Sequence, residues 1–187
     1  MATGGAPWSM LVAHPRTPGA GVYGIGAEVR FIRPMVLFCD YTLHADMAQV
    51  RIPQRQGGSP VDGLWQHTCF EAFIGVPGAD EYYEFNFSPG GDWAAYRFGA
   101  YREGGTTATM SAAPQLQVYR NAERLELSAT VPIDALAGIA EAAVLRVALT
   151  SVVEDAAGEL SYWSLRHAAG KPDFHHADGF VLELRSP

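Results

Sequence analysis

The stretch HTCFEAFIGVPGADEYYEFNFSPGGDW, residues 67–93, decides the fold. Apolar and polar residues alternate with a period of two through residues 67–76 and again through 81–88, as is typical of β-strands with one buried face. The apolar faces carry Phe70, Ala72 and Ile74 in the first segment and Tyr83, Phe85 and Phe87 in the second. Pro and Gly residues separate the two segments, and SPGGD at 88–92 predicts a tight hairpin into a further strand.

The same alternation continues on both sides of this stretch. It recurs in residues 29–31, 116–118, 125–131 and 145–153, with turn-forming residues at 102–105 and 155–159, so we expect at least eight strands. Only PIDALAGIAEAA, residues 132–143, predicts a short helix, because Pro is favoured at a helix start. The fold class is therefore expected to be an all-β, antiparallel, two-sheet β-sandwich with one short helix, in which jelly-roll connections are one possible strand order. Leu127 and Leu149 are expected to join the six apolar residues above in its core.

Length and composition indicate one domain. A chain of 187 residues with 48% hydrophobic residues can bury one full core, so residues 1–187 are expected to form a single unit. A net charge of -7 with only 13 Lys and Arg argues against nucleic acid as a partner. No apolar run predicts a signal peptide or a membrane span, which leads us to expect a cytoplasmic protein with no membrane partner. Cys39 and Cys69 are expected to be buried reduced thiols.

Several motifs carry little functional weight. Gly19, Gly21 and Gly24 match G-x-G-x-x-G by letter, but a strand-like run follows them where a dinucleotide site needs a helix. His175 and His176 are adjacent, and on a strand they would point to opposite faces, so no metal site is predicted there. The polar segment 54–63 is expected to be a long surface loop.

Two acidic residues admit a catalytic alternative. Glu71 and Glu84 are predicted on neighbouring strands and can face the same way, as the carboxyl pair of a glycoside hydrolase does. A carboxylate can equally accept hydrogen bonds from sugar hydroxyls without catalysing a reaction. Non-catalytic binding is the preferred interpretation, and hydrolysis by this pair stays as an alternative.

Aromatic and polar residues occur together in the middle and at the end of the chain. A sugar has an apolar C–H face and a rim of hydroxyls, so its sites combine aromatic surfaces with polar groups. The candidate site is therefore built from ten residues: Trp65, Glu71, Glu84, Asn86, Arg97, Trp163, Lys171, Asp173, Phe174 and His175. Core packing is the competing explanation for each aromatic residue taken singly.

The segments at 63–98 and 160–184 resemble DOMON-like domains related to type 9 carbohydrate-binding modules, and especially small bacterial members of unsettled role. The resemblance spans about residues 22–184. Its most characteristic part is a tryptophan before a strand, an acid on that strand, and then a Y-x-F-x-x-x-P-x-G hairpin. The resemblance implies a non-catalytic domain that binds a carbohydrate or a sugar-bearing small molecule.

The resemblance also implies roles for individual residues. In type 9 modules the sugar lies between two tryptophans, and Trp65 matches the first of these, with Glu71 as the strand acid and Asn86 and Arg97 as polar positions. Where the family has its second tryptophan, this chain has Phe174, His175 and His176, while Trp163 lies earlier. A strict two-tryptophan site is therefore not expected.

Two other functions remain open at this point. Some DOMON domains bind haem through axial Met and His, for which Met35, Met47 or Met110 with His44 or His67 would be available. No C-x-x-C-H attachment motif occurs. The second alternative is a protein-interaction module that has no small ligand.

Overall fold

The computed structural model describes residues 5–54 and 57–187, and the side chains from residue 8 onward. Within these ranges the chain is all-β, with three short 3-10 helices and no α-helix. The strands are β1 (Gly5–Ala13), β2 (Val22–Arg33), β3 (Val36–Ala45), β4 (Cys69–Gly75), β5 (Tyr82–Phe87), β6 (Trp93–Phe98), β7 (Thr106–Thr107), β8 (Gln115–Arg120), β9 (Arg124–Pro132), β10 (Val144–Glu154), β11 (Leu160–Ser164) and β12 (Leu182–Arg185). The 3-10 helices are η1 (Met47–Gln49), η2 (Leu64–Gln66) and η3 (Ala177–Gly179).

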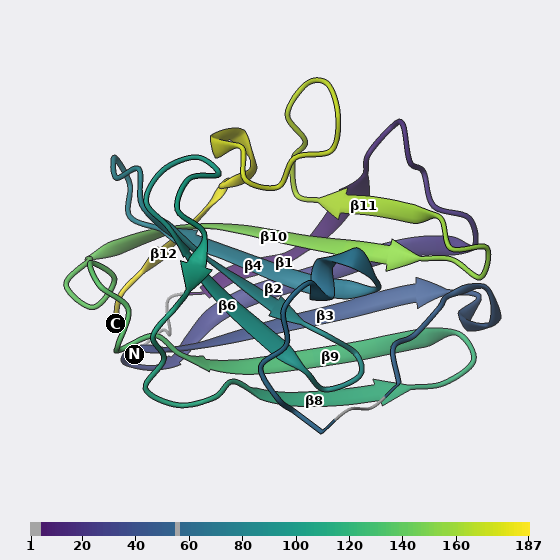
Figure 1. Cartoon of the computed structure of the whole chain (residues 1–187), viewed down its shortest axis with the longest axis horizontal. Helices are drawn as coiled ribbons and strands as arrows, with labels where there is room; N and C mark the ends of the chain where they lie inside the picture. The colour runs from purple at the N-terminus through teal and green to yellow at the C-terminus, as the bar shows by residue number, and fades with distance from the viewer. Residues whose placement is uncertain (1–4, 55–56) are drawn as a thin grey trace.

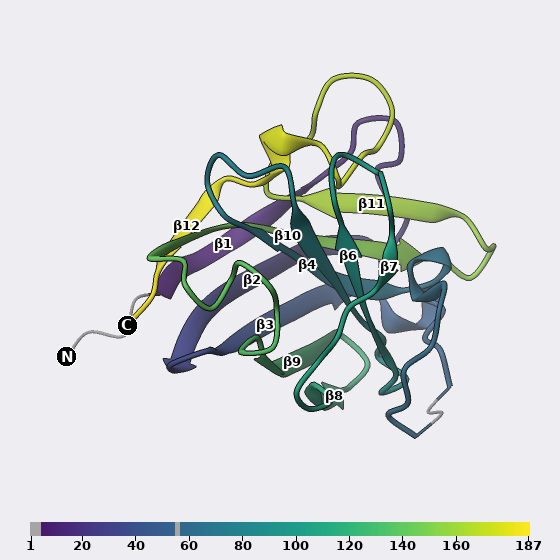
Figure 2. The same ribbon diagram turned by 60° about the vertical axis from the view of Figure 1, so that its left-hand side comes forward.

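The strands form one strongly curled antiparallel sheet. Hydrogen bonding connects them in the order β7-β6-β5-β4-β10-β11-β1-β2-β3-β9-β8, and β12 pairs with the first residues of β10. Figures 1 and 2 show the curl, in which β8 and β9 lie on the opposite side of the molecule from β10 and β11. The prediction of an all-β antiparallel fold is confirmed. The predicted division into two separate sheets is not confirmed. The curl has two arms, one formed by β2, β3, β9 and β8 and the other by β11, β10, β4, β5, β6 and β7. β1 pairs with both β2 and β11 and so joins the two arms into one sheet.

The hydrophobic core fills the inside of the curl. All eight predicted core residues belong to it: Phe70, Ala72, Ile74, Tyr83, Phe85, Phe87, Leu127 and Leu149. The two arms meet directly there, since the rings of Tyr41 on β3 and Phe70 on β4 are 5.1 Å apart and the Tyr41 hydroxyl donates to the backbone oxygen of Glu71 at 2.7 Å. Period-two alternation therefore identified the inner face correctly. Both cysteines are buried and reduced.

The hairpin 88–92 forms as predicted. The backbone N–H of Ser88 donates to Asp92 and that of Gly91 donates back to Ser88, so that Phe87 and Trp93 face each other across β5 and β6. Gly90 is required here, because a Cβ at this position would lie 2.6 Å from the backbone oxygen of Gln54. The predicted loop 54–63 includes residues 55 and 56, which lie outside the described residues, and its positions 57–62 are exposed.

The predicted helix at 132–143 is wrong. Residues 133–142 form successive three-residue turns, in which Leu136, Ile139 and Ala142 each donate a backbone hydrogen bond to the residue three positions earlier. Ile133, Leu136 and Ile139 are buried at this three-residue spacing, and Gly138 has a φ of 73°, which an α-helix does not accommodate. Packing of the apolar residues into the core thus overrides the helix propensity of the alanines.

The outer face of β4 and β5 is covered as well, and this cover positions the candidate site. Every residue of both strands is buried. The segment 165–180 packs over this face through a second, smaller apolar cluster that includes Phe73, Tyr82 and Phe174. None of the described residues forms a helix that is long and apolar enough to span a bilayer.

Candidate ligand-binding cavity

The antiparallel register arranges the outer-face side chains in rows across neighbouring strands. One row runs through Phe73 on β4, Glu84 on β5 and Tyr96 on β6. The adjacent row runs through Thr150 on β10, Glu71 on β4 and Asn86 on β5. Because successive residues of a strand point to opposite faces, these residues share the outer face.

A cavity of about 590 Å³ lies over these rows. Four residues of these rows, Glu71, Phe73, Glu84 and Tyr96, form its floor. Its walls come from η2, from the segment after β6 and from residues 171–175. Six of the side chains that line it are aromatic: Trp65, Phe73, Tyr96, Phe98, Tyr162 and Phe174. The volume falls within the range of small-molecule sites.

Two carboxyl groups lie on the floor of this cavity. Glu71 and Glu84 are 2% and 4% exposed. Burial, and then the charge of Glu84, raises the pKa of Glu71 well above its usual value. Burial also raises the pKa of Glu84 to about 7, against the lowering effects of a 2.6 Å hydrogen bond from the Asn86 amide and of the Arg102 charge. A Thr150 hydroxyl donates to Oε2 of Glu71 at 3.3 Å, while Oε1 has no hydrogen-bond partner among the described residues.

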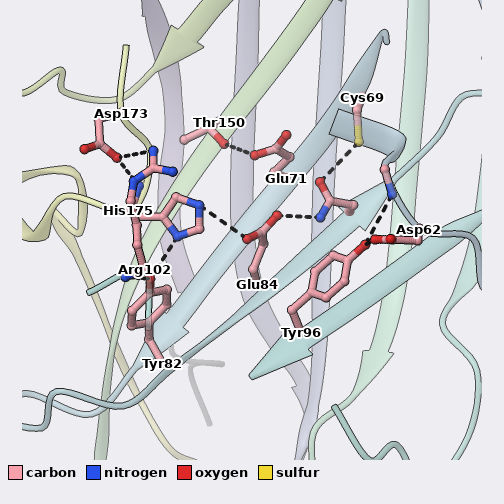
Figure 3. A network of polar contacts seen from close by, with 12 residues as sticks. Asp62, Cys69, Glu71, Tyr82, Glu84, Tyr96, Arg102, Thr150, Asp173 and His175 are labelled. Carbon is pink, nitrogen blue, oxygen red and sulfur yellow. Dashed lines mark hydrogen bonds and ion pairs between the residues drawn. The ribbon is translucent and has the colours of Figure 1, made fainter. Parts of the chain in front are cut away.

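His175 reaches the same floor from the C-terminal segment, as Figure 3 shows. The Tyr82 oxygen accepts from the backbone N–H of Arg102 at 3.1 Å, and the Tyr82 hydroxyl lies 2.8 Å from Nδ1 of His175. We assign the ring proton to Nε2, which lies 3.7 Å from Oε2 of Glu84. Burial, together with the Arg102 charge, lowers the pKa of His175 to about 4. Near neutral pH the imidazole is therefore uncharged, and its contact with Glu84 is not an ion pair.

Arg102 and Asp173 connect two segments of the cavity wall. Nη2 of Arg102 donates to Oδ1 of Asp173 at 2.8 Å, and the Tyr101 hydroxyl also donates to this carboxylate. The backbone N–H of His175 donates to the same Oδ1 at 3.1 Å. These hydrogen bonds, with the charge of Arg102, lower the pKa of Asp173 although burial acts against them. The Arg102 charge is thus compensated within the wall (Figure 3).

Trp65 lines the cavity from η2, and half of its surface is exposed. Tyr96 supports this side, because its hydroxyl donates to Asp62 and accepts from the backbone N–H of Gly63 at 3.4 Å. An exposed indole at the edge of a cavity provides a flat apolar surface to which a ligand can stack. The structure thus places Trp65 outside the hydrophobic core.

The structure brings together six of the ten residues predicted for the site. Trp65, Glu71, Glu84, Lys171, Phe174 and His175 line the cavity. Asp173 lies behind them and holds Arg102. Asn86 lies beneath the floor, where its amide donates to Glu84 and its oxygen lies 3.5 Å from the thiol of Cys69.

Arg97 and Trp163 are not at the cavity, and strand alternation explains both. Arg97 follows Tyr96 and so points to the other side of β6, where its Nε donates to Glu81 at 3.0 Å. Trp163 follows Tyr162 on β11 and points into the core, where it is 6% exposed and its indole N–H donates to Ser161.

Nine of the residues that line the cavity lie outside the sequence-based site, among them Phe73, Tyr96, Phe98 and Arg102. Phe73 shares a strand face with Glu71 two positions away, and Tyr96 and Phe98 share a face on β6, so alternation together with strand pairing could have found them. Arg102 lies in a turn with a φ of 57°, and no local pattern indicates its position.

The residues proposed for the haem alternative lie elsewhere. Met35, Met47, Met110, His44 and His67 do not line the cavity, and His67 contacts Glu154 at 2.7 Å. Within residues 5–54 and 57–187, no group of three or more His, Cys, Asp or Glu side chains is arranged to hold a metal ion.

Comparisons with known proteins place this geometry in a known fold. No protein-family model matches the sequence, and no curated protein matches it. A crystal structure described as a putative carbohydrate-binding protein from Bacteroides uniformis is similar with a TM-score of 0.71 and 18% identity, over 96% of this chain and 85% of that one. A family 9 carbohydrate-binding module from Caldicellulosiruptor kristjanssonii, in complex with cellotriose, is similar with a TM-score of 0.50 and 12% identity, over 96% of this chain and 81% of that one. The chain therefore shares its fold with these two proteins, one of which is a type 9 carbohydrate-binding module.

Proposed function

We propose that this chain is a non-catalytic carbohydrate-binding domain whose ligand, a sugar or a sugar-bearing small molecule, occupies the cavity over β4, β5 and β6. The observation that carries the proposal is a half-exposed tryptophan at one edge of an aromatic-walled cavity whose floor holds buried carboxyl groups. Trp65 would stack on the apolar face of a sugar ring. Glu71 and Glu84 would bind its polar groups, whose burial without partners costs about 1 to 3 kcal/mol each.

Binding without catalysis fits the acidic pair better than hydrolysis does. Glycoside hydrolysis needs one protonated and one ionised carboxyl placed around the scissile bond. Glu71 and Glu84 lie side by side on one floor, and burial raises the pKa of both. Burial thus works in both groups against the ionised state that a nucleophile or a base requires. The structural neighbour in complex with cellotriose also supports a sugar as the kind of ligand.

Substitution of Trp65 tests the proposal. The wild-type protein is screened against soluble mono- and oligosaccharides, and hits are measured by calorimetry. For Trp65→Ala we expect the affinity to fall by about tenfold or more, equivalent to about 1.4 kcal/mol of lost stacking. The melting temperature should stay near the wild-type value, because half of the indole is already in solvent.

Trp8→Ala is the matched control. Trp8 is also about half exposed, but it lies on β1 and does not line the cavity, so this variant should keep the wild-type affinity. The proposal fails if no sugar in the panel binds, or if Trp65→Ala binds as tightly as Trp8→Ala does.

A further inference from the structure

The two floor carboxyls lack a compensating positive charge. Glu71 and Glu84 are diagonal neighbours on β4 and β5, since Glu71 pairs with Asn86 and Phe73 pairs with Glu84. Such neighbours lie roughly 7 to 8 Å apart at the backbone, within reach of long side chains. Among the described residues, no Lys or Arg forms an ion pair with either carboxyl, and Oε1 of Glu71 is buried without a hydrogen-bond partner.

The groups that face this pair come from every surrounding element, and most of them are neutral. They are Thr150 on β10, Tyr162 on β11, Cys69 on β4, Tyr82 and Asn86 on β5, Tyr96 on β6, Arg102 after β6, and His175 in the C-terminal segment. Two cations lie at the cavity: Arg102 is bound by Asp173, and Lys171, which also lines the cavity, forms no ion pair with either carboxyl among the described residues. His175 is neutral near pH 7, because burial lowers its pKa to about 4.

A ligand cation would complete this arrangement in a way that a hydroxyl would not. A sugar hydroxyl can donate one hydrogen bond to Oε1 of Glu71, but it brings no positive charge that would stabilise the ionised form of either carboxyl. An ammonium group donates up to three hydrogen bonds and also supplies the missing charge. The aromatic walls add a further attraction, since a cation near the face of an aromatic ring is stabilised by its quadrupole.

We propose that the sugar bound in this cavity carries a free amino group, as an unacetylated 2-amino-2-deoxy sugar does, and that its ammonium lies between Glu71 and Glu84 opposite the stacking surface of Trp65. This inference rests on the carbohydrate-binding function proposed above. It distinguishes the ligand from a neutral sugar and from an N-acetylated one, neither of which brings a positive charge to the floor.

The pH dependence of binding separates the two modes of recognition. An ammonium binds the ionised carboxyls, so its binding drives protons off Glu84 and Glu71 and weakens as the pH falls. A neutral sugar that accepts a hydrogen bond from a protonated carboxyl binds more tightly as the pH falls. With a pKa of about 7, the ionised fraction of Glu84 drops about 50-fold between pH 7 and pH 5. The sugar amine, like an α-amino group, stays mostly protonated below about pH 7.7.

Calorimetry with three disaccharides tests the inference. The probes are β-1,4-linked glucosamine disaccharide, its di-N-acetylated form and cellobiose, each measured at pH 7 and pH 5. We expect the glucosamine disaccharide to bind at least tenfold more tightly than the other two at pH 7, and to lose about 50-fold in affinity at pH 5. Equal or weaker binding of the glucosamine form, or an affinity that is flat or higher at pH 5, would overturn the inference.

Isosteric variants locate the amine. Glu84→Gln and Glu71→Gln should each lower the affinity for the glucosamine disaccharide at least tenfold at pH 7 and change that for cellobiose much less. Glu183→Gln, at an exposed acid on β12, is the matched control and should behave as wild type. Equal losses for both disaccharides would contradict the assigned ammonium position. The pH comparison on wild-type protein needs no variant and decides the question even if a substitution impairs folding.

The outcomes also separate this inference from the proposed function. Trp65-dependent binding of cellobiose or the acetylated sugar, without preference for the amine, rejects the amino sugar and leaves carbohydrate binding intact. Absence of binding across the whole sugar panel rejects both.

Discussion

At the scale of single residues, the candidate site is defined by two carboxyl groups that the fold buries at a cost. A buried carboxyl with a raised pKa favours its protonated form, so each such group makes the folded state less stable once it must ionise. Glu71 and Glu84 both meet this condition. Placing unfavourable groups at a cavity is typical of binding sites, where a ligand removes the penalty.

Glu84→Gln should stabilise the protein at high pH. The folded-state pKa of about 7 lies above the usual value of 4.5, so the stability tied to this group is complete below about pH 4.5 and is lost as the pH rises through 7. A shift of this size corresponds to on the order of 3 kcal/mol. We expect Glu84→Gln to melt several degrees above wild type at pH 8 and close to wild type at pH 4.5, as measured by thermal unfolding at both pH values.

His175 changes the stability of the protein with pH in the opposite direction. The contribution of Glu84 is therefore read from the comparison between wild type and Glu84→Gln, and not from the wild-type protein alone. Its lowered pKa means that stability tied to the imidazole is lost as the pH falls from about 6.5 through 4. In the wild-type protein the contributions of Glu84 and His175 to stability partly offset each other between pH 4.5 and 6.5. The difference in melting temperature between wild type and Glu84→Gln gives the contribution of the Glu84 carboxyl alone. A melting difference that is the same at pH 4.5 and pH 8 would show that Glu84 has an ordinary pKa in the folded protein.

At the scale of secondary-structure elements, the cavity depends on contacts between segments that are distant in the sequence. β4, β5 and β6 form a meander through two short turns and supply the floor. The walls come from η2 before the meander, from residues 99–105 after it, and from the segment 165–180 near the end of the chain. The ion pair between Arg102 and Asp173 holds the last two together.

Asp173→Asn should weaken ligand binding and lower stability moderately. The substitution keeps an acceptor oxygen but removes the charge that holds Arg102, and the Arg102 and Asp173 side chains are 48% and 10% exposed. An exposed pair contributes up to about 1 kcal/mol, and because Asp173 is largely buried we expect a loss of at least about this size in the free energy of unfolding. The affinity for the sugar identified in the screen should fall several-fold, because the two wall segments are no longer fixed relative to each other.

Glu81→Gln provides the comparison for this prediction. It removes the charge from an ion pair with Arg97 that lies outside the cavity, so calorimetry should give the wild-type affinity. Equal affinities for Asp173→Asn and wild type would show that the bridge does not position the ligand.

At the scale of the whole molecule, the two arms of the curled sheet share one core. Residues of β3 and β9 in one arm belong to the same apolar cluster as residues of β4, β5 and β10 in the other. Only a few backbone pairs join β1 to β11, so the shared core, rather than the sheet, couples the arms. The protein is therefore expected to unfold in a single cooperative transition.

Leu127→Ala tests this coupling from the arm that lies away from the cavity. Leu127 on β9 is fully buried, so its truncation should cost about 2 to 5 kcal/mol. Far-ultraviolet circular dichroism and tryptophan fluorescence should report coincident transitions, both at lower temperature than in wild type. Val118→Ala, at a partly exposed position on the neighbouring β8, should melt close to wild type. Separate transitions for the two probes would show that the arms unfold independently.

The sequence by itself determined several of the strands, their inner faces and some of the residues that line the cavity. Period-two alternation is a local property that records which side of a strand is buried, and it identified all eight core positions. The turn residues in SPGGD were also sufficient to predict the hairpin, because its geometry is local. For Trp65, Glu71 and Glu84, residue type and placement next to strands indicated a site that these residues do share.

Only the tertiary structure decided how the sheet closes and which residues meet at the cavity. Alternation does not encode strand order, so it could not show that β1 joins the strands into one curled sheet. It also does not show which outer face a distant segment will cover, and it is this cover that brings residues 171–175 and Arg102 together over the carboxyl groups. The segment 133–142 likewise adopts the turns that bury its apolar residues in the core, and not the helix that its local propensity favours. In each case long-range packing is decisive, because its free energy depends on contacts between parts of the chain that are far apart in sequence.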